Sequence, residues 1–166
     1  YLDAEAAIEY LGSHEGVVVD RQLVLFGRSL GCAVAVEMAT RHQVRTVILE
    51  SPFTSVRAMA KRHYPFLPAA LLARLVQSSF DSLSKIADVH SPLMVFHGDA
   101  DDIVPFAAGR QLFDAANEPK RFYSISGAGH NDTYMVGGEA YFEALKRFIM
   151  YCGFTISSKC AINVWD

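Results

Sequence analysis

The sequence predicts a three-layer αβα fold, in which helices cover both faces of a mostly parallel sheet. Short apolar runs at 23–26, 46–49 and 92–96 have the length and composition of buried parallel strands, and we expect a fourth strand at 121–125. Segments with helical spacing of apolar residues separate most of these runs. The chain has 166 residues, 51% of them hydrophobic, which is enough for one packed domain. Strands that alternate with helices build βαβ units.

The first segment of the chain has the pattern of a helix with acidic residues in its opening turn. Asp3 and Glu5 stand where a helix N-terminus favours negative charge. Each expected strand except the second is followed by one segment in which apolar residues recur at helical spacing. We therefore expect helices at 2–11, 33–41, 106–116 and 139–151.

Residues 51–89 interrupt this alternation, because they are far longer than one crossover helix requires. They contain two expected helices, 56–62 and 69–77. We interpret the segment as a helical cap or lid inserted over the strand ends, within a domain of residues 1–151. Residues 152–166 form a tail to which no element or function is assigned.

The inserted segment is rich in apolar side chains, which would suit an apolar ligand such as an acyl chain. Phe53, Tyr64 and Phe66 are the candidate substrate-binding residues. The alternative is that these side chains only cover the core of the domain itself.

Bulk properties exclude several classes of partner. The net charge is −3 and lysine and arginine are not clustered, so neither nucleic acid nor an anionic membrane is expected. No run approaches the roughly 20 apolar residues of a membrane span, and the acidic, helix-like start of the sequence leads us to expect no secretory signal. Cys32, Cys152 and Cys160 do not have the spacing of a zinc site, and they indicate reduced thiols in a cytoplasmic protein. We expect no metal and no cofactor; the oligomeric state is left open.

The pentapeptide Gly27-Arg28-Ser29-Leu30-Gly31 matches the nucleophile-elbow pattern G-x-S-x-G. Such an elbow turns a strand into a helix at the serine, and small neighbours let the two backbones approach. An expected strand precedes the pattern and an expected helix follows it, as the motif requires. Ser29 is therefore the candidate nucleophile, and the backbone N–H of Leu30 is the candidate oxyanion donor.

A serine nucleophile needs a base, and His130 is the candidate among six histidines. It lies in a glycine-rich loop directly after the fourth expected strand, at the edge of the sheet where the elbow also lies. His97 ends the third strand, and we expect it to hold the following turn in place. The other histidines, expected at the surface, are His14, His42, His63 and His90.

Spacing alone does not identify which acidic residue orients the base. Asp99, Asp101 and Asp102 all follow the third strand, and Glu50 ends the second. Any of them would give the order serine, acid, histidine that is typical of α/β-hydrolases and differs from chymotrypsin or subtilisin.

Four stretches resemble the α/β-hydrolase superfamily, and more narrowly the group that includes bud-emergence-type proteins and protein depalmitoylases. The resemblance extends from Leu23 to about Ile149. It implies that Asp101 is the acid and that His130 is the base. The matching stretches are Gly27-Arg28-Ser29-Leu30-Gly31, Glu50-Ser51-Pro52-Phe53, His97-Gly98-x-x-Asp101-x-x-Val104-Pro105 and Gly129-His130-Asn131-Asp132.

The same resemblance implies that the four strands are the C-terminal half of an α/β-hydrolase fold. About four strands normally precede the elbow strand, and their loops supply a second oxyanion donor. Only 22 residues precede Leu23, so we expect a missing N-terminal segment, which could also carry a membrane anchor. The elbow strand would then lie at an exposed, apolar edge of the sheet.

The leading functional hypothesis is a serine hydrolase that cleaves ester or thioester bonds of a small-molecule or lipid-like substrate. Ser29 would attack the acyl carbon, His130 would move the proton and Asp101 would orient the imidazole. One alternative is a truncated, non-catalytic or weakly active remnant that acts as a binding module. Another is a serine peptidase with the same three residues.

Overall fold

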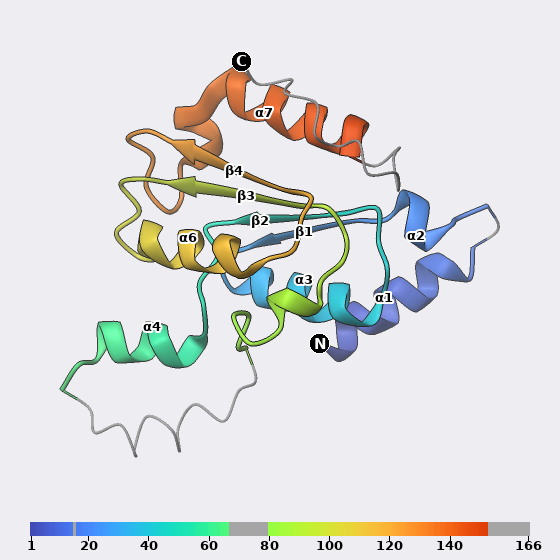
Figure 1. Cartoon of the computed structure of the whole chain (residues 1–166), viewed down its shortest axis with the longest axis horizontal. Coiled ribbons are helices and arrows are strands. Elements are labelled where there is room, and N and C mark those ends of the chain that lie inside the picture. The colour runs from blue at the N-terminus through green and yellow to red at the C-terminus, as the bar shows by residue number, and fades with distance from the viewer. Residues whose placement is uncertain (15, 67–79, 153–166) are drawn as a thin grey trace.

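The computed structural model of the chain describes residues 1–14, 16–66 and 80–152 (Figure 1). Helices and strands alternate along most of this range. In chain order the elements are α1 (Leu2–Gly12), α2 (Val19–Gln22), β1 (Val24–Arg28), α3 (Leu30–Arg41), β2 (Thr46–Glu50), α4 (Val56–His63), the 3₁₀ turn η1 (Ile86–Asp88), β3 (Leu93–Gly98), α6 (Phe106–Ala115), β4 (Lys120–Ile125) and α7 (Thr133–Cys152).

All four expected strands are present, and they form a parallel sheet in the order β1-β2-β3-β4. The predicted α/β fold class is thus confirmed. The register pairs Gly27 with Leu49, and Leu49 with Val95. Because every strand runs the same way, the loops after all four strands leave from one edge of the sheet.

Alternate side chains of each strand enter two separate cores. Val47 and Leu49 point to the face covered by α3, α6 and η1, where they pack with buried residues such as Val36 and Leu112. Ile48 points to the opposite face, which α7 covers. Figure 1 shows α7 on one side of the sheet and α3 and α6 on the other. The described residues therefore form three layers.

The elbow strand β1 is an outer strand of this sheet, since within the described residues it pairs with β2 alone. Its Phe26 pairs with Ile48, which points to the face that carries α7, and is 49% exposed. The expected apolar edge is therefore present in the described part of the chain.

Helix α7 begins earlier than expected, at Thr133 instead of residue 139. Gly138, with φ 51° and ψ −140°, kinks it, so the predicted helix corresponds to the part after the kink. Gly138 is not helical itself, in line with the low helix propensity of glycine, and the residues of α7 that pack on the sheet, such as Tyr141 and Phe148, follow it. The short helix α2 was not expected either.

Two other predictions fall on undescribed parts of the chain. The helix expected at 69–77 and the tail after residue 152 lie outside the described residues. The helix expected at 56–62 corresponds to α4, where the Ser55 side chain accepts a hydrogen bond from the Ala58 N–H as an N-cap. None of the helices in the described ranges has both the length and the apolar character needed to cross a membrane.

The junction between β1 and α3 depends on one of its two glycines. A Cβ on Gly27 would lie 2.5 Å from the Gly31 carbonyl oxygen and 2.7 Å from the Cα of Cys32. A Cβ on Gly31 would meet no atom of the described residues within 4 Å. Close approach of strand and helix therefore requires a glycine at position 27, and within the described residues it does not require one at position 31.

We predict that Gly27→Ala lowers the free energy of unfolding by about 2 kcal/mol or more, because backbone atoms must move to admit the methyl group. Gly31→Ala is the matched control: alanine is the better helix former, so stability should stay the same or rise by up to about 1 kcal/mol. Urea unfolding followed by circular dichroism measures both. Equal losses in the two variants would contradict this account of the junction.

Candidate active site

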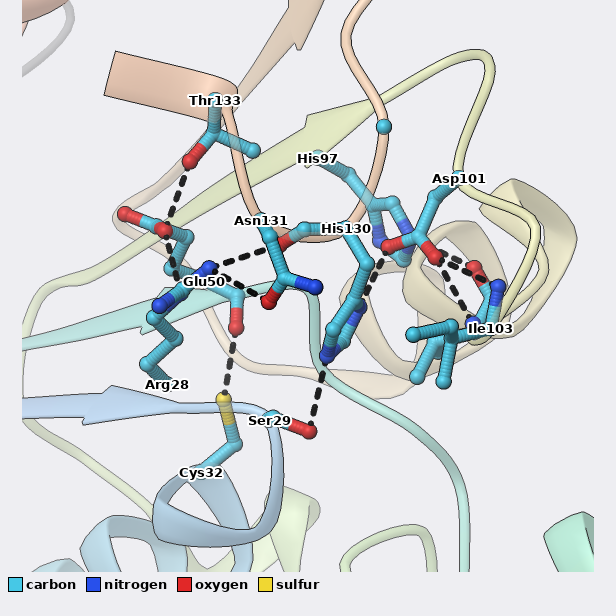
Figure 2. Close-up of polar contacts among 12 residues, drawn as sticks. Arg28, Ser29, Cys32, Glu50, His97, Asp101, Ile103, His130, Asn131 and Thr133 are labelled. Carbon is cyan, nitrogen blue, oxygen red and sulfur yellow. Dashed lines mark hydrogen bonds and ion pairs between the residues drawn. The ribbon is translucent and has the colours of Figure 1, made fainter. Parts of the chain in front are cut away.

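Ser29 occupies the sharp turn between β1 and α3. Its φ of 50° and ψ of −118° are uncommon for any residue with a side chain. The Ser29 N–H donates to the Glu50 carbonyl oxygen at 2.9 Å, so the neighbouring strand holds the strained turn. The turn leaves the hydroxyl half-buried and facing the loop between β4 and α7 (Figure 2).

That loop carries His130, whose buried ring lies between Ser29 and Asp101 (Figure 2). The His130 Nε2 is 3.0 Å from the Ser29 Oγ, and its Nδ1 is 2.8 Å from the Asp101 Oδ2. The structure thus brings together three side chains predicted from loops after three different strands.

Asp101 is held in place by the loop to which it belongs. Its Oδ1 accepts the backbone N–H groups of Ile103 at 3.0 Å and Val104 at 2.7 Å, while its Oδ2 faces His130. Burial alone would raise the pKa of Asp101, but hydrogen bonds from His130 and the Val104 N–H bring that pKa below its ordinary value. Asp101 is therefore ionised at neutral pH.

The charge state of Asp101 decides the tautomer of His130. An ionised carboxylate only accepts hydrogen bonds, so the His130 Nδ1 donates to Asp101. The Nε2 of the neutral ring is then left to accept a proton from the Ser29 hydroxyl. This is the arrangement that a general base requires.

The rival acids lie elsewhere at the same edge of the sheet. Asp99 Oδ1 accepts the Gly127 N–H at 2.6 Å and so joins the β3 and β4 loops, and Asp102 is exposed. Glu50 is buried and forms an ion pair with Arg28. Among the described residues, Asp101 is the carboxylate that the structure places in hydrogen-bond contact with the His130 ring.

The buried His97 side chain contacts the backbone of the loop that carries Asp101, as expected. It is fully buried, and its Nε2 lies 3.0 Å from the Val104 carbonyl oxygen, to which it donates. Its Nδ1 has no partner within the described residues and faces Gly109, where a Cβ would lie 2.2 Å away. Burial lowers the pKa of His97, so the ring stays neutral. The prediction that His97 holds this turn is confirmed.

The candidate oxyanion donor, the Leu30 N–H, directly follows Ser29. Leu30 is the first residue of α3, and the first N–H groups of a helix have no partner within the helix. They present partial positive charge beside the Ser29 hydroxyl.

The three candidate substrate-binding residues differ in their surroundings. Phe53 is only 5% exposed and packs in a small apolar cluster with Ala33 and Val104, which leaves little of its ring for a ligand. Tyr64 and Phe66 are exposed and lie just after α4. The last residue of α4, His63, contacts the Ile103 carbonyl oxygen at 3.0 Å and so joins this segment to the Asp101 loop.

Two features of the site were missed in the sequence. Ser51 has the same positive φ of 50° as Ser29, but it is fully buried. Arg28 reaches from the elbow to the His130 loop, where its Nη2 lies 2.8 Å from the His130 carbonyl oxygen. The available signal was a pair of opposite charges at the ends of two expected strands, Arg28 and Glu50, which the register pairs. No group of three or more histidine, cysteine or acidic side chains among the described residues could hold a metal ion.

Comparisons of the sequence relate most of the chain to known proteins. A model of the prolyl oligopeptidase family matches residues 1–147. An uncharacterized protein of Mycobacterium tuberculosis is 42% identical over 147 residues, which are 89% of this chain and 51% of that protein. The human α/β-hydrolase domain-containing protein 17B is 32% identical over 153 residues, which are 90% of this chain and 48% of that protein. The chain thus spans about half the length of these relatives.

Solved structures share the fold. The esterase domain of a Rhodothermus marinus protein superposes with a TM-score of 0.64 at 24% identity, covering 89% of this chain and 68% of that one. A Pyrococcus furiosus esterase gives a TM-score of 0.70 at 18% identity, covering 90% of this chain and 60% of that one. A monoacylglycerol lipase of Paleococcus ferrophilus gives 0.65 at 17% identity, covering 91% and 74%.

The buried His97 predicts a specific pH dependence of stability. The pKa of His97 is below its ordinary value of 6.5 in the folded protein, so as pH falls through 6.5 the unfolded chain binds a proton that the folded protein does not. The free energy of unfolding should fall by up to about 1.4 kcal/mol per pH unit from this residue. Urea unfolding between pH 7 and 5 should therefore show a steeper loss in the wild type than in His97→Gln. Parallel curves would mean that folding does not lower the pKa of His97.

Proposed function

Because this chain belongs to the prolyl oligopeptidase family, within the α/β-hydrolase superfamily, we propose that it is a serine hydrolase that cleaves carboxylic ester or thioester bonds. The observation that carries the proposal is the continuous line of hydrogen bonds from Asp101 through His130 to Ser29. The resemblance to α/β-hydrolases found in the sequence is confirmed by the family match and by the shared fold.

In the proposed reaction the Ser29 Oγ attacks the acyl carbon while the His130 Nε2 takes the hydroxyl proton. The ionised Asp101 stabilises the resulting imidazolium, and the Leu30 N–H donates to the oxyanion. When the acyl carbon loses the alcohol or thiol, His130 returns its proton to that leaving group. Water, deprotonated by His130, then hydrolyses the acyl-enzyme and restores Ser29.

The surroundings of Ser29 favour an apolar acyl group. Large apolar side chains a few residues after Ser29, Asp101 and His130 in the chain are exposed, namely Leu30, Ile103 and Tyr134. Tyr64 and Phe66 belong to the segment 51–89, which we propose as the cap of this site. The Paleococcus ferrophilus neighbour is a monoacylglycerol lipase, an enzyme of a lipid ester. We therefore propose a small-molecule or lipid-like ester or thioester as the substrate.

A peptidase activity is the second candidate, because the matching family is that of prolyl oligopeptidase. The same three side chains would serve amide hydrolysis, with the leaving amine taking the proton from His130. Turnover of p-nitrophenyl esters against aminoacyl p-nitroanilides separates the two activities. A folded protein that turns over neither substrate would favour a binding module instead.

The choice of acid gives the most direct mutational test. With p-nitrophenyl butyrate, Ser29→Ala should reduce hydrolysis to background. Asp101→Asn should lower kcat by about 10³–10⁴-fold, because the His130 Nδ1 loses its charged partner. Asp99→Asn is the matched control: its retained oxygen can still accept the Gly127 N–H, so kcat should stay within about threefold. Equal losses at both aspartates would contradict the assignment of Asp101.

A further inference from the structure

The buried carboxylate of Glu50 is a second charged centre beside the site. Its side chain is only 3% exposed, and its Oε1 lies 3.0 Å from the Arg28 Nε and 2.7 Å from the Thr133 Oγ1. The Tyr141 hydroxyl donates to Oε2, and burial together with Glu50 raises the pKa of Tyr141, so this donor keeps its proton. Donors from β1 and from two turns of α7 therefore meet on one carboxylate at the end of β2.

The Arg28 guanidinium extends this centre to the loop of the proposed base (Figure 2). While Nε pairs with Glu50, Nη2 donates to the His130 carbonyl oxygen at 2.8 Å and to the Asn131 Oδ1 at 3.2 Å. A planar guanidinium fixes the angle between partners on its two sides, which an ammonium group does not. The backbone of His130 is thus tied to Glu50 through one rigid group.

The same residue, Glu50, also contacts the nucleophile's turn. Its carbonyl oxygen accepts the Ser29 N–H at 2.9 Å and the Cys32 thiol at 3.2 Å. The loop of the base is held at both ends, by Arg28 at residue 130 and by the Glu50–Thr133 hydrogen bond three residues later. Glu50 therefore joins the backbone of the nucleophile to the backbone of the base.

We propose that the Arg28–Glu50 pair is a positioning device that sets the His130 imidazole against Ser29. This inference rests on the proposed function of the site. Within the described residues, neither Arg28 nor Glu50 forms a hydrogen bond with the His130 ring or the Ser29 hydroxyl. Both residues act through the backbone of the loop that carries His130. Because a displacement of about 1 Å in a reacting group can cost about 10²-fold in rate, loss of the pair should lower kcat more than substrate binding.

A merely structural ion pair would behave differently, and the chain offers a control. Arg41 and Glu37 form an Arg–Glu pair within α3, and the Arg41 side chain is 43% exposed, against 39% for Arg28. Arg41 is the last residue of α3 and Ser29 is its N-cap, so Arg41 lies about 18 Å along the helix from the elbow. Arg41→Gln should affect stability alone.

The experiment measures kcat and KM for p-nitrophenyl butyrate, and urea unfolding, in the wild type, Arg28→Lys, Arg28→Gln, Glu50→Gln, Arg28→Gln/Glu50→Gln and Arg41→Gln. We expect each single change at Arg28 or Glu50 to lower kcat by about 10- to 100-fold while KM stays within about threefold. Arg28→Lys keeps the charge but not the planar fork, so it should also lose kcat. The double variant should be within about threefold of the worse single variant, because the two residues act as one unit.

Three outcomes would overturn the proposal: Arg28→Lys or Arg28→Gln with wild-type kcat, losses in the double variant that multiply, or an equal loss of kcat in Arg41→Gln. If Glu50→Gln does not fold, the half-exposed Arg28 variants still decide the question. Failure of the proposed function is distinguishable, because the wild type itself would then show no turnover that Ser29→Ala removes.

Discussion

Four parallel strands that end at one edge of the sheet determine which residues of this chain can meet. The loops after β1, β3 and β4 carry Ser29, Asp101 and His130, which are far apart in sequence and adjacent in space. The register supplies the rest of the geometry. It sets Arg28 beside Glu50, and the Ser29 N–H beside the Glu50 carbonyl oxygen. Strained backbone at Ser29 persists because its neighbours in the sheet hold it.

Two buried carboxylates, those of Asp101 and Glu50, accept hydrogen bonds from different elements at the carboxyl ends of the strands. Asp101 faces the His130 ring and remains ionised because backbone N–H groups and the imidazole offset its burial. Glu50 faces away from that ring and collects donors from β1 and α7. A buried charge without partners would be costly, so each carboxylate fixes the elements that supply its donors. The architecture therefore links the fold of the domain to the geometry of the proposed reaction.

The strands and the positions of Ser29 and His130 could be predicted, because strand ends in a parallel sheet are recognisable from apolar runs and from the residues that follow them. Spacing alone left Asp99, Asp101 and Asp102 open. The loop conformation separates them, since the bonds from Asp101 to the Ile103 and Val104 N–H groups turn its other oxygen toward His130. A sequence without strand register does not show such a loop.

The proposed role of Arg28 was missed for a related reason. The contacts of Arg28 depend on the register that pairs it with Glu50 and on the loop that ends at Thr133. The start of α7 at Thr133 was not predicted, because Gly137 and Gly138 have low helix propensity.

Covalent labelling with a fluorophosphonate tests whether Ser29 is an activated nucleophile. We expect one adduct per chain, located on Ser29 by peptide mass spectrometry and absent in Ser29→Ala. Ser51→Ala should label like the wild type, because Ser51 shares the backbone strain of Ser29 but is fully buried. A folded wild-type chain that takes no label, or takes it on a residue other than Ser29, would contradict the account.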